Sequence, residues 1–537
     1  AASASFSATL LSSLVPEVFT GSSTPTFTRA TTAYVTDFEG LLKQVPSGCA
    51  RLSGARFVRN MLGIASNNVA ALTTFGGAST VTATTMEATG ANAGRTVGAP
   101  AAVWAGTGRC RVKLTAISVA PSVQISCDGG TSYTSVTVTS TPQVFTASSS
   151  QATAVIGAFT IRLANIGDNI TIEEMMVENT TGQSNTNPSE YVSVGVLSAP
   201  YHGAGVDGCK YFTTENGNTV ASNVVTEATG AAISSATLLG YQAEGARTNR
   251  CLQSQVFSNA AWVSGGGGIA VTDNSIAAPD GTTTADTLTA SGANGTLIQD
   301  LGVVASAAKA GGLWIKRKTG TGNVDLTLDG GATWTNITIT AGWTRVQKTQ
   351  TLADEDFGIR IVTSGDEVYA WQGQVETASF LSSAIPTTTV AVTRNDDSLT
   401  YSRASNLDNA TGTFYAEAMT QEASGAYGYP QILGTGNPGM KVTIVSSGAV
   451  NFNDGTVNVD VTTAGSFATA MRKVAAGWGS GTMTLCKDAG SVSSGVFAGN
   501  MGFGATFSIG GVAGGSNHLE GNIRNVSIWA TKKTDAE

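Results

Sequence analysis

The chain has 537 residues and a formal net charge of −8; 41% of its residues are hydrophobic and only 12% are charged. The apolar fraction suffices for packed cores, which excludes wholesale disorder, and the length predicts about three or four domains. The acidic balance excludes nucleic acid as a general partner, because phosphate binding needs a basic surface. No apolar run reaches about 18 residues, so we expect no membrane span.

Residues 1–45 form the first recognisable unit. They are rich in Ser and Thr, with one ordered-looking piece, FTRATTAYVTDFEGLLKQVP. We interpret this unit as an extended N-terminal arm that anchors the protein to a particle. Its low charge would let it add to a neighbour's β-sheet.

An internal repeat is the most informative pattern in the chain. VQISCDGGTSYTSVTVT (123–139) matches VDLTLDGGATWTNITIT (324–340), and the Asp-Gly-Gly stretches align at a constant offset of 201. A second match, 160–178 against 358–376, follows at offset 198. Two matched stretches in the same order predict one duplicated module.

Short alternating or β-branched segments, separated by Asp-Gly and Gly-Gly pairs, dominate the chain. This pattern is typical of strands joined by tight turns. We therefore predict an all-β fold of tandem β-sandwich or jelly-roll modules, two of them an internal duplication, with an extended N-terminal arm. The predicted divisions are an arm at 1–45, module one at 46–180, a connector at 181–246, module two at 247–380, a linker at 381–404 and module three at 405–537.

Side-chain alternation after each Asp-Gly-Gly turn predicts which residues enter a core. Successive side chains of a strand point to opposite faces. Val136 and Val138 in the first copy, and Ile337 and Ile339 in the second, should therefore point inward.

Four residues are candidates for carbohydrate binding. Tyr133 and Trp334 directly precede the repeated strand, where each ring would either plug the edge of a sandwich or stack on a sugar. Trp371 is a third aromatic candidate, and His518 lies in a Gly-rich loop that is either plain surface or a ligand contact. Exposed rings would favour glycan binding, whereas buried rings would favour a purely structural role.

Asp128 and Asp329 open the two Asp-Gly-Gly turns. Each either makes the turn by local hydrogen bonds or offers a carboxylate to Ca²⁺, and we expect no other cofactor. Among the six cysteines, Cys110 and Cys127 flank a predicted hairpin and could pair, although free buried thiols are favoured.

No residue pattern predicts catalysis. The only histidines, His202 and His518, lie in no catalytic or zinc-binding spacing. Adjacent acids such as Glu173 and Glu174 point to opposite faces of a strand and make a poor glycosidase pair. We assign no catalytic residues and expect that the protein is not an enzyme.

One segment of the connector and module two resembles a known protein class. LLGYQAEGARTNRCLQSQVFSNAAWV (238–263) resembles a segment recurrent in bacteriophage virion proteins, and AAPDGTTTADTLT (277–289) also looks like those proteins. In that class the module looks like a carbohydrate-binding jelly roll. The residues that carry the resemblance are Glu244, Arg247, Thr248, Asn249, Phe257, Ser258, Asn259, Ala260, Ala261 and Trp262.

Module three resembles the concanavalin A-like (laminin-G-like) sandwich of the same virion proteins. The pattern is carried by Gly521, Ile523, Val526, Ile528 and Trp529. The resemblance implies localisation in a virion, as a tail or head fibre, spike or capsid decoration protein that attaches to host-surface glycans. It also implies other virion proteins as partners and a homo-oligomer, with a trimer as one arrangement. The alternatives are an architectural cement protein without sugar binding and, with less support, a polysaccharide depolymerase.

Overall fold

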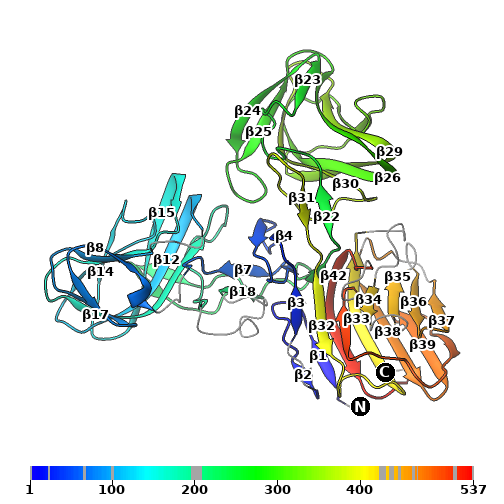
Figure 1. Cartoon of the computed structure of the whole chain (residues 1–537), viewed down its shortest axis with the longest axis horizontal. Helices are drawn as coiled ribbons and strands as arrows, with labels where there is room; N and C mark the ends of the chain where they lie inside the picture. The colour runs from blue at the N-terminus through cyan, green and yellow to red at the C-terminus, as the bar shows by residue number, and fades with distance from the viewer. Residues whose placement is uncertain are drawn as a thin grey trace.

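The computed structural model describes residues 3–21, 25–63, 68–97, 102–194, 208–421, 431–434, 441–444, 449–462, 466–468, 470–511 and 517–534. Within these ranges almost every element is a β-strand, and the one helix is a 3-10 turn at Val69–Ala71. The prediction of an all-β, multi-sandwich fold is confirmed. Figure 1 shows three lobes that meet at a narrow junction.

The first lobe is a sandwich built mainly from module one. One of its sheets has the order β19 (Thr219–Ala221), β20 (Val224–Thr226), β15 (Gln143–Ile156), β12 (Trp104–Ala116), β17 (Asn169–Asn179), β10 (Thr85–Ala88) and β9 (Ser79–Val81). The facing sheet has the order β14 (Thr134–Thr137), β13 (Ser122–Ser126), β16 (Thr160–Leu163), β11 (Ala93–Thr96) and β8 (Thr73–Gly76). Buried aliphatic side chains of both sheets form its core.

The second lobe is module two, whose long strands bend and contribute to both layers. Its strand order is β24 (Ile269–Ile276), β25 (Ala285–Ala290), β30 (Glu367–Glu376), β26 (Gly295–Thr319), β29 (Thr344–Ile361), β27 (Val324–Thr327) and β28 (Thr335–Ile337). A further strand, β23 (Val263–Gly266), pairs with β26.

The repeat predicted from the sequence is confirmed at the level of strand register. In the β13–β14 hairpin Val123 faces Val136, and in the β27–β28 hairpin Val324 faces Ile337, each 201 residues later. Across the adjoining strand, Gln124 faces Arg162 and Asp325 faces Arg360. Because the register is the same in both copies, the same side chains enter both cores.

The alternation prediction is also confirmed. Val136, Val138 and Ile337 are buried, and Ile339 is partly buried against the core of module two. The intervening threonines are exposed.

The third lobe is a sandwich of the C-terminal residues together with the N-terminal ones. One sheet has the order β2 (Val18–Phe19), β1 (Phe6–Ala8), β42 (Gly521–Trp529), β33 (Gly412–Thr420), β38 (Arg472–Gly479), β39 (Thr482–Lys487) and β40 (Ser493–Val496). The other has the order β3 (Thr26–Thr28), β32 (Ser398–Ser402), β41 (Thr506–Ile509), β34 (Gln431–Gly434), β35 (Lys441–Ile444), β36 (Val450–Asn453) and β37 (Asn458–Val461).

The N-terminal segment therefore differs from the extended arm expected for residues 1–45. Strand β1 pairs with β42, and β3 pairs with β32 (Figure 1). Phe6 is fully buried, with its ring centroid 5.0 Å from that of Tyr401 and 5.3 Å from that of Phe507. The segment satisfies strand edges of its own chain and fills a core that the C-terminal residues leave incomplete.

The segment between modules one and two also differs from a simple connector. Four short strands from 181–246 join other parts of the chain: β18 (Cys209–Phe212), β19, β20 and β21 (Gly240–Ala243). At the junction, β18 pairs with β7 (Arg56–Arg59), and β21 pairs with β42 and with β6 (Leu52–Ser53). Two further ladders complete the junction: β4 (Ala33–Thr36) with β5 (Leu42–Val45), and β22 (Arg247–Asn249) with β31 (Val392–Arg394).

Candidate functional site

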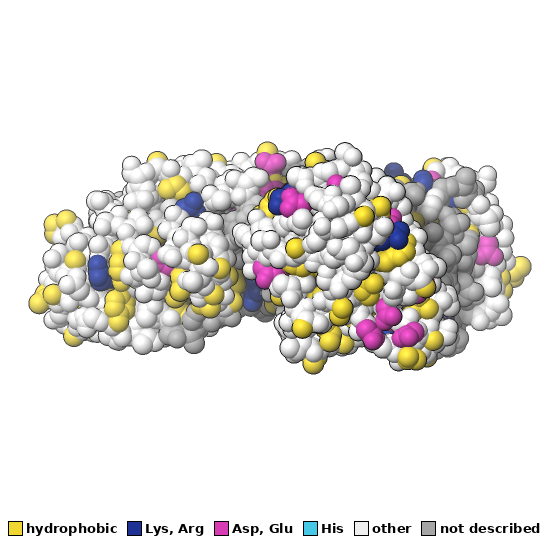
Figure 2. Space-filling view, turned by 90° about the horizontal axis from the view of Figure 1, so that it is seen from above, with side chains coloured by type: hydrophobic (Ala, Val, Ile, Leu, Met, Phe, Trp, Pro, Cys, Tyr) yellow, Lys and Arg dark blue, Asp and Glu magenta, His cyan; other side chains and the backbone are white. Residues whose placement is uncertain are grey.

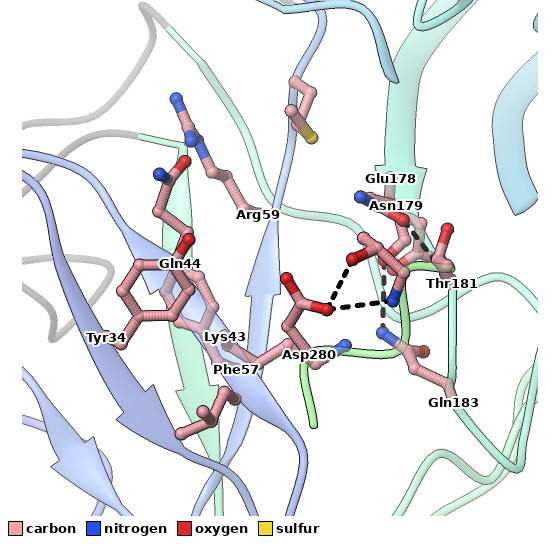
Figure 3. Close-up of a pocket in the computed structure, with 13 residues that line it drawn as sticks. Tyr34, Lys43, Gln44, Phe57, Arg59, Glu178, Asn179, Thr181, Gln183 and Asp280 are labelled. Atoms are coloured by element: carbon pink, nitrogen blue, oxygen red, sulfur yellow. Dashed lines mark hydrogen bonds between the residues drawn. The ribbon is translucent and has the colours of Figure 1, made fainter. Parts of the chain in front are cut away.

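A pocket lies at this junction, where segments far apart in the sequence meet (Figure 3). Its volume is about 220 Å³, and it is partly open to solvent. It is lined by Tyr34, Leu42, Lys43, Gln44, Phe57, Arg59, Met61, Glu178, Asn179, Thr181, Gln183, Asp280 and Thr282. These residues come from β4, β5, β7, the end of β17 and the β24–β25 loop.

The β4–β5 hairpin is held against module two by backbone contacts. The backbone N–H of Leu42 donates to the carbonyl oxygen of Pro279 at 3.0 Å. Close by, Gly182 and Gly281 both have positive φ, and a Cβ on Gly182 would lie 2.5 Å from the Cα of Gly281. Only glycine tolerates this approach, so the two loops that border the pocket touch through their backbones.

The hairpin turn is shaped by a carboxylate. Asp37 Oδ1 accepts hydrogen bonds from the backbone N–H groups of Glu39 and Leu41, both at 2.9 Å. Gly40 adopts a φ of +82° in the same turn. This Asx-type turn sets the direction of β5 and so brings Lys43 to the pocket.

Tyr34 and Phe57 provide the apolar wall of the pocket, and both are largely buried. Burial raises the pKa of the Tyr34 phenol well above its usual value, so the hydroxyl stays protonated at neutral pH. In Figure 3 both rings stand on one side, Asn179, Thr181 and Gln183 on the other, and Asp280 between them. The pocket thus combines an aromatic wall with fixed polar groups.

Burial also perturbs the acids of the pocket. It raises the pKa of Glu178, against the opposing effect of the hydrogen bond that Ser189 N donates at 2.6 Å. Burial likewise raises the pKa of Asp280, whose Oδ1 accepts hydrogen bonds from Thr282 N at 2.9 Å and Thr282 Oγ1 at 2.6 Å. Ionisable groups with shifted pKa values in a concave site are typical of functional sites.

The rings of Tyr133 and Trp334 are half-buried, and each is covered by an arginine. The guanidinium carbon of Arg162 lies 4.1 Å from the Tyr133 centroid, and that of Arg360 lies 4.6 Å from the Trp334 centroid. One face of each ring is therefore occupied by its own chain.

Trp371 does not fit the stacking role expected for it. It is fully buried, its ring lies 5.5 Å from that of Trp314, and its Nε1 donates to Thr284 Oγ1 at 3.0 Å. A sugar cannot reach a ring that solvent does not reach, so Trp371 is a core residue of module two.

His518 is buried rather than a surface loop residue. Its Nε2 lies 3.5 Å from Asp396 Oδ2, beside the buried carboxylate of Glu520. It belongs to the packing between module three and the β22–β31 ladder, and it lies outside the pocket.

Asp128 and Asp329 make their turns by the same set of contacts. Asp128 accepts from Ser126 Oγ at 2.6 Å and Ser149 Oγ at 2.7 Å, and Asp329 accepts from Thr327 Oγ1 at 2.8 Å. Burial by itself would raise the pKa of both carboxyls. The hydrogen bonds to each carboxylate outweigh this effect, so both pKa values lie well below the usual range.

The donors around these two carboxylates are hydroxyl and N–H groups, which satisfy an anion without a metal. The predicted turn-making role therefore explains the contacts of Asp128 and Asp329. These contacts give no support to the Ca²⁺ alternative. Cys110 and Cys127 are free buried thiols, as are Cys49, Cys209 and Cys251.

A buried ionic cluster joins distant segments of the chain behind the pocket. Asp397 binds Arg29 at 2.8 Å and also Arg51, while Glu244 binds Arg51 at 2.7 Å and Arg394 at 3.4 Å. All five side chains are fully or almost fully buried. The cluster joins the N-terminal segment, the connector and the predicted linker 381–404.

This cluster also contacts the pocket wall directly. Arg51 Nη1 donates to the backbone carbonyl of Tyr34 at 3.2 Å. Two residues of the phage-like motif are structural here: Glu244 belongs to the cluster, and Asn249 Nδ2 donates to the carbonyls of Gly373 and Ile385 at 3.1 and 2.8 Å.

The pocket residues were not singled out from the sequence, since no local motif marks them. Two segments noted in the sequence did include part of the site. Tyr34 lies within the ordered-looking piece of the N-terminal unit, and Asp280 and Thr282 lie within 277–289, which resembles phage virion sequences. A search for where those two segments meet would have found the site.

No family model matches the chain, and a comparison with curated proteins finds no match. Similar solved structures include the serotype D botulinum neurotoxin binding domain, at 11% identity and TM-score 0.21 over 26% of this chain and 38% of that one. They also include the tandem CBM22 domains of Paenibacillus barcinonensis Xyn10C, at 8% identity and TM-score 0.19 over 61% and 100% of the two chains. The laminin LG4-5 domains of mouse alpha1 chain match at 11% identity and TM-score 0.19 over 45% and 89%.

The similarities are too weak for any inference about function. This chain spans 38% of the neurotoxin chain that it matches. Among the described residues, no helix has the length and apolar character needed to cross a membrane. Figure 2 shows one face of the molecule with only scattered charged side chains, in keeping with the low charge content.

Proposed function

We propose that this protein is a non-enzymatic carbohydrate-binding protein of a bacteriophage virion, and that the junction pocket holds one sugar unit of a host-surface glycan. The pocket carries the proposal. Its aromatic wall, Tyr34 and Phe57, suits the C–H face of a pyranose, and its amides, hydroxyls and carboxylates suit sugar hydroxyls. A volume of about 220 Å³ suits a single ring rather than a long chain.

The virion part of the proposal is supported by the sequence alone. The segment 238–263 and the C-terminal sandwich both resemble parts of phage virion proteins. On this basis the protein acts in a fibre, spike or capsid decoration, with other virion proteins and further copies of itself, such as a trimer, as partners. We assign it no catalytic residue.

An array of bacterial surface polysaccharides tests the binding function. The wild-type protein should bind a subset of them, and Asp280→Asn and Gln183→Ala should each weaken that binding. A chain that binds no polysaccharide on the array would contradict the proposal. Cryo-electron microscopy of the particle tests the virion assignment, which requires density for this chain on the capsid or the tail.

An architectural cement protein is the second candidate. It is favoured by the full burial of Trp371 and by the arginines that cover Tyr133 and Trp334. This candidate predicts no glycan binding, density at capsid lattice points, and particles that lose stability without the protein.

A further inference from the structure

Two buried cysteines meet in the core of module one, one from each sheet. Cys110 lies within β12 of the sheet that contains β15 and β17, and Cys127 directly follows β13 of the facing sheet. Their exposed fractions are 0% and 1%, and both belong to the same hydrophobic core. The two thiols thus point toward each other from opposite layers of the sandwich.

The ladder register shows how closely the two layers approach at this point. Cys110 is the ladder partner of Ala147 in β15. Cys127 Sγ lies 4.0 Å from the carbonyl oxygen of Ala147 and 3.7 Å from that of Gly108 on β12. The Cys127 thiol therefore reaches the backbone on both sides of Cys110, close enough to act on the Cys110 thiol itself.

Module two shows that side chains at these two positions are in direct contact. Gly311 and Leu328 stand at the equivalent positions, each 201 residues later, and Gly311 has the equivalent ladder partner, Lys348. A Cβ on Gly311 would lie 2.4 Å from Leu328 Cδ2, so the leucine side chain occupies the space that the glycine leaves. Module one fills the same space with two thiols.

We infer that Cys110 and Cys127 form a disulfide bond when the chain folds in an oxidising environment, and that this bond cross-links the two sheets of module one. Each thiol loses its hydrogen as the S–S bond forms, and two electrons and two protons pass to a disulfide oxidant, which becomes two thiols. Both cysteines are free thiols in this structure, which is the reduced state. The inference is independent of the proposed glycan binding.

The bond has to form before the core closes. The hydrogen bond with Cys127 and burial raise the pKa of the Cys110 thiol well above its usual value. Because the thiolate is the group that attacks a disulfide, the folded, reduced chain reacts slowly with an oxidant. The folding step itself must therefore take place under oxidising conditions for the test to report pairing rather than access.

Secretion of the full chain into a bacterial periplasm supplies a protein disulfide oxidant during folding. The product is denatured, its remaining thiols are alkylated, and it is digested with trypsin, which cleaves after Arg111 and Lys113 and so separates the two cysteines. We expect mass spectrometry to find the Cys110 peptide joined to the Cys127 peptide, at about 2 Da below the sum of the two, until a reductant is added.

The double change Cys110→Gly with Cys127→Leu is the matched control, because it copies the packing of module two. Hydrogen exchange of β12 and β13 compares secreted protein with the same protein made in the reducing cytoplasm. In the wild type, exchange should be at least about 10-fold slower in the secreted protein, since the cross-link restricts opening of the two strands. In the double variant the two preparations should agree, and Cys127→Ala serves as a second variant with the same expectation.

Alkylated Cys110 and Cys127 in the secreted, folded wild type would overturn the inference, as would pairing of either residue with another cysteine. A Cys110–Cys127 bond that leaves the exchange of both strands unchanged would overturn its role as a cross-link between the sheets.

Discussion

The guanidinium of Arg360 lies over the indole ring of Trp334, with its carbon 4.6 Å from the ring centroid. Arg360 Nη2 also pairs with Asp325 Oδ2 at 2.6 Å. The first repeat has the same arrangement with different residues: Arg162 lies over Tyr133 and donates to Gln124 through Nε at 2.8 Å. The duplicated hairpin has thus kept an arginine clamp although its aromatic and polar partners have changed.

The clamp should stabilise module two measurably. Arg360→Met removes a cation–π contact and a partly buried ion pair, so we expect a loss of about 1–2 kcal/mol in the free energy of unfolding. Hydrogen exchange of residues 324–340 measures it locally. The matched change Arg162→Met should cost less, because its polar partner, Gln124, is neutral. Equal losses in the two modules would contradict the contribution assigned to Asp325.

The Asp-Gly-Gly turns should depend on their carboxylates and not on calcium. Asp128→Ala leaves the hydroxyls of Ser126 and Ser149 without their acceptor, and we expect a loss of about 2–4 kcal/mol. Because the pKa of Asp128 is depressed in the fold, its stabilisation is present above about pH 4 and is lost as the pH falls further. Thermal melts with CaCl₂ and with EDTA should coincide; a calcium-dependent rise in Tm that Asp128→Ala abolishes would restore the metal site.

The buried cluster at the junction should control attachment of the N-terminal segment. Asp397→Asn leaves the charges of Arg29 and Arg51 without their shared partner, and breaking a buried pair of this kind costs about 3–5 kcal/mol. Hydrogen exchange should then show lost protection in β3 and β32. The neighbouring Asp396→Asn is the control, since Asp396 is partly exposed and lies beside His518, which is outside the cluster.

The third lobe should become less stable as the pH rises through neutrality. Burial raises the pKa of Glu520 from 4.5 to about 7, in spite of Arg247 at 3.0 Å. The folded state therefore binds more protons than the unfolded state between about pH 4.5 and 7, and its stability falls across that window by up to about 3 kcal/mol.

Urea unfolding at pH 5 and pH 8 measures this effect. The difference between the two pH values should shrink in Glu520→Gln, which cannot ionise. Glu417→Gln on the same sheet is the control of opposite sign. Hydrogen bonds from Arg524 and its neighbours outweigh burial and lower the pKa of Glu417, so its stabilisation is present above about pH 4.5 and is lost as the pH falls.

Local patterns were sufficient to predict the strands and the repeat. The alternation around Val136 and Ile337 predicted their burial, because a strand has only two faces and one of them must enter the core. The same reasoning could not place Trp371. A tryptophan in a β-segment fits a core and a binding surface equally well, and only its contact with Trp314 decides.

The partners of the N-terminal strands were beyond local prediction. Nothing in the residues around Phe6 shows that their strand pairs with Ile528, more than 500 positions away. The pocket was missed for the same reason, since Tyr34, Glu178 and Asp280 are brought together by the pairing of distant strands and by the contact of Gly182 with Gly281.

By itself, the sequence determined the all-β class, the duplicated hairpin and its inward-facing residues, because these follow from periodicity over a few residues. Only the tertiary structure decided that the N-terminal segment completes the C-terminal sandwich and that Lys43 shares a pocket with Glu178 and Asp280. Burial and the pairing of charges depend on which surfaces meet, and that is a property of the whole fold rather than of any segment.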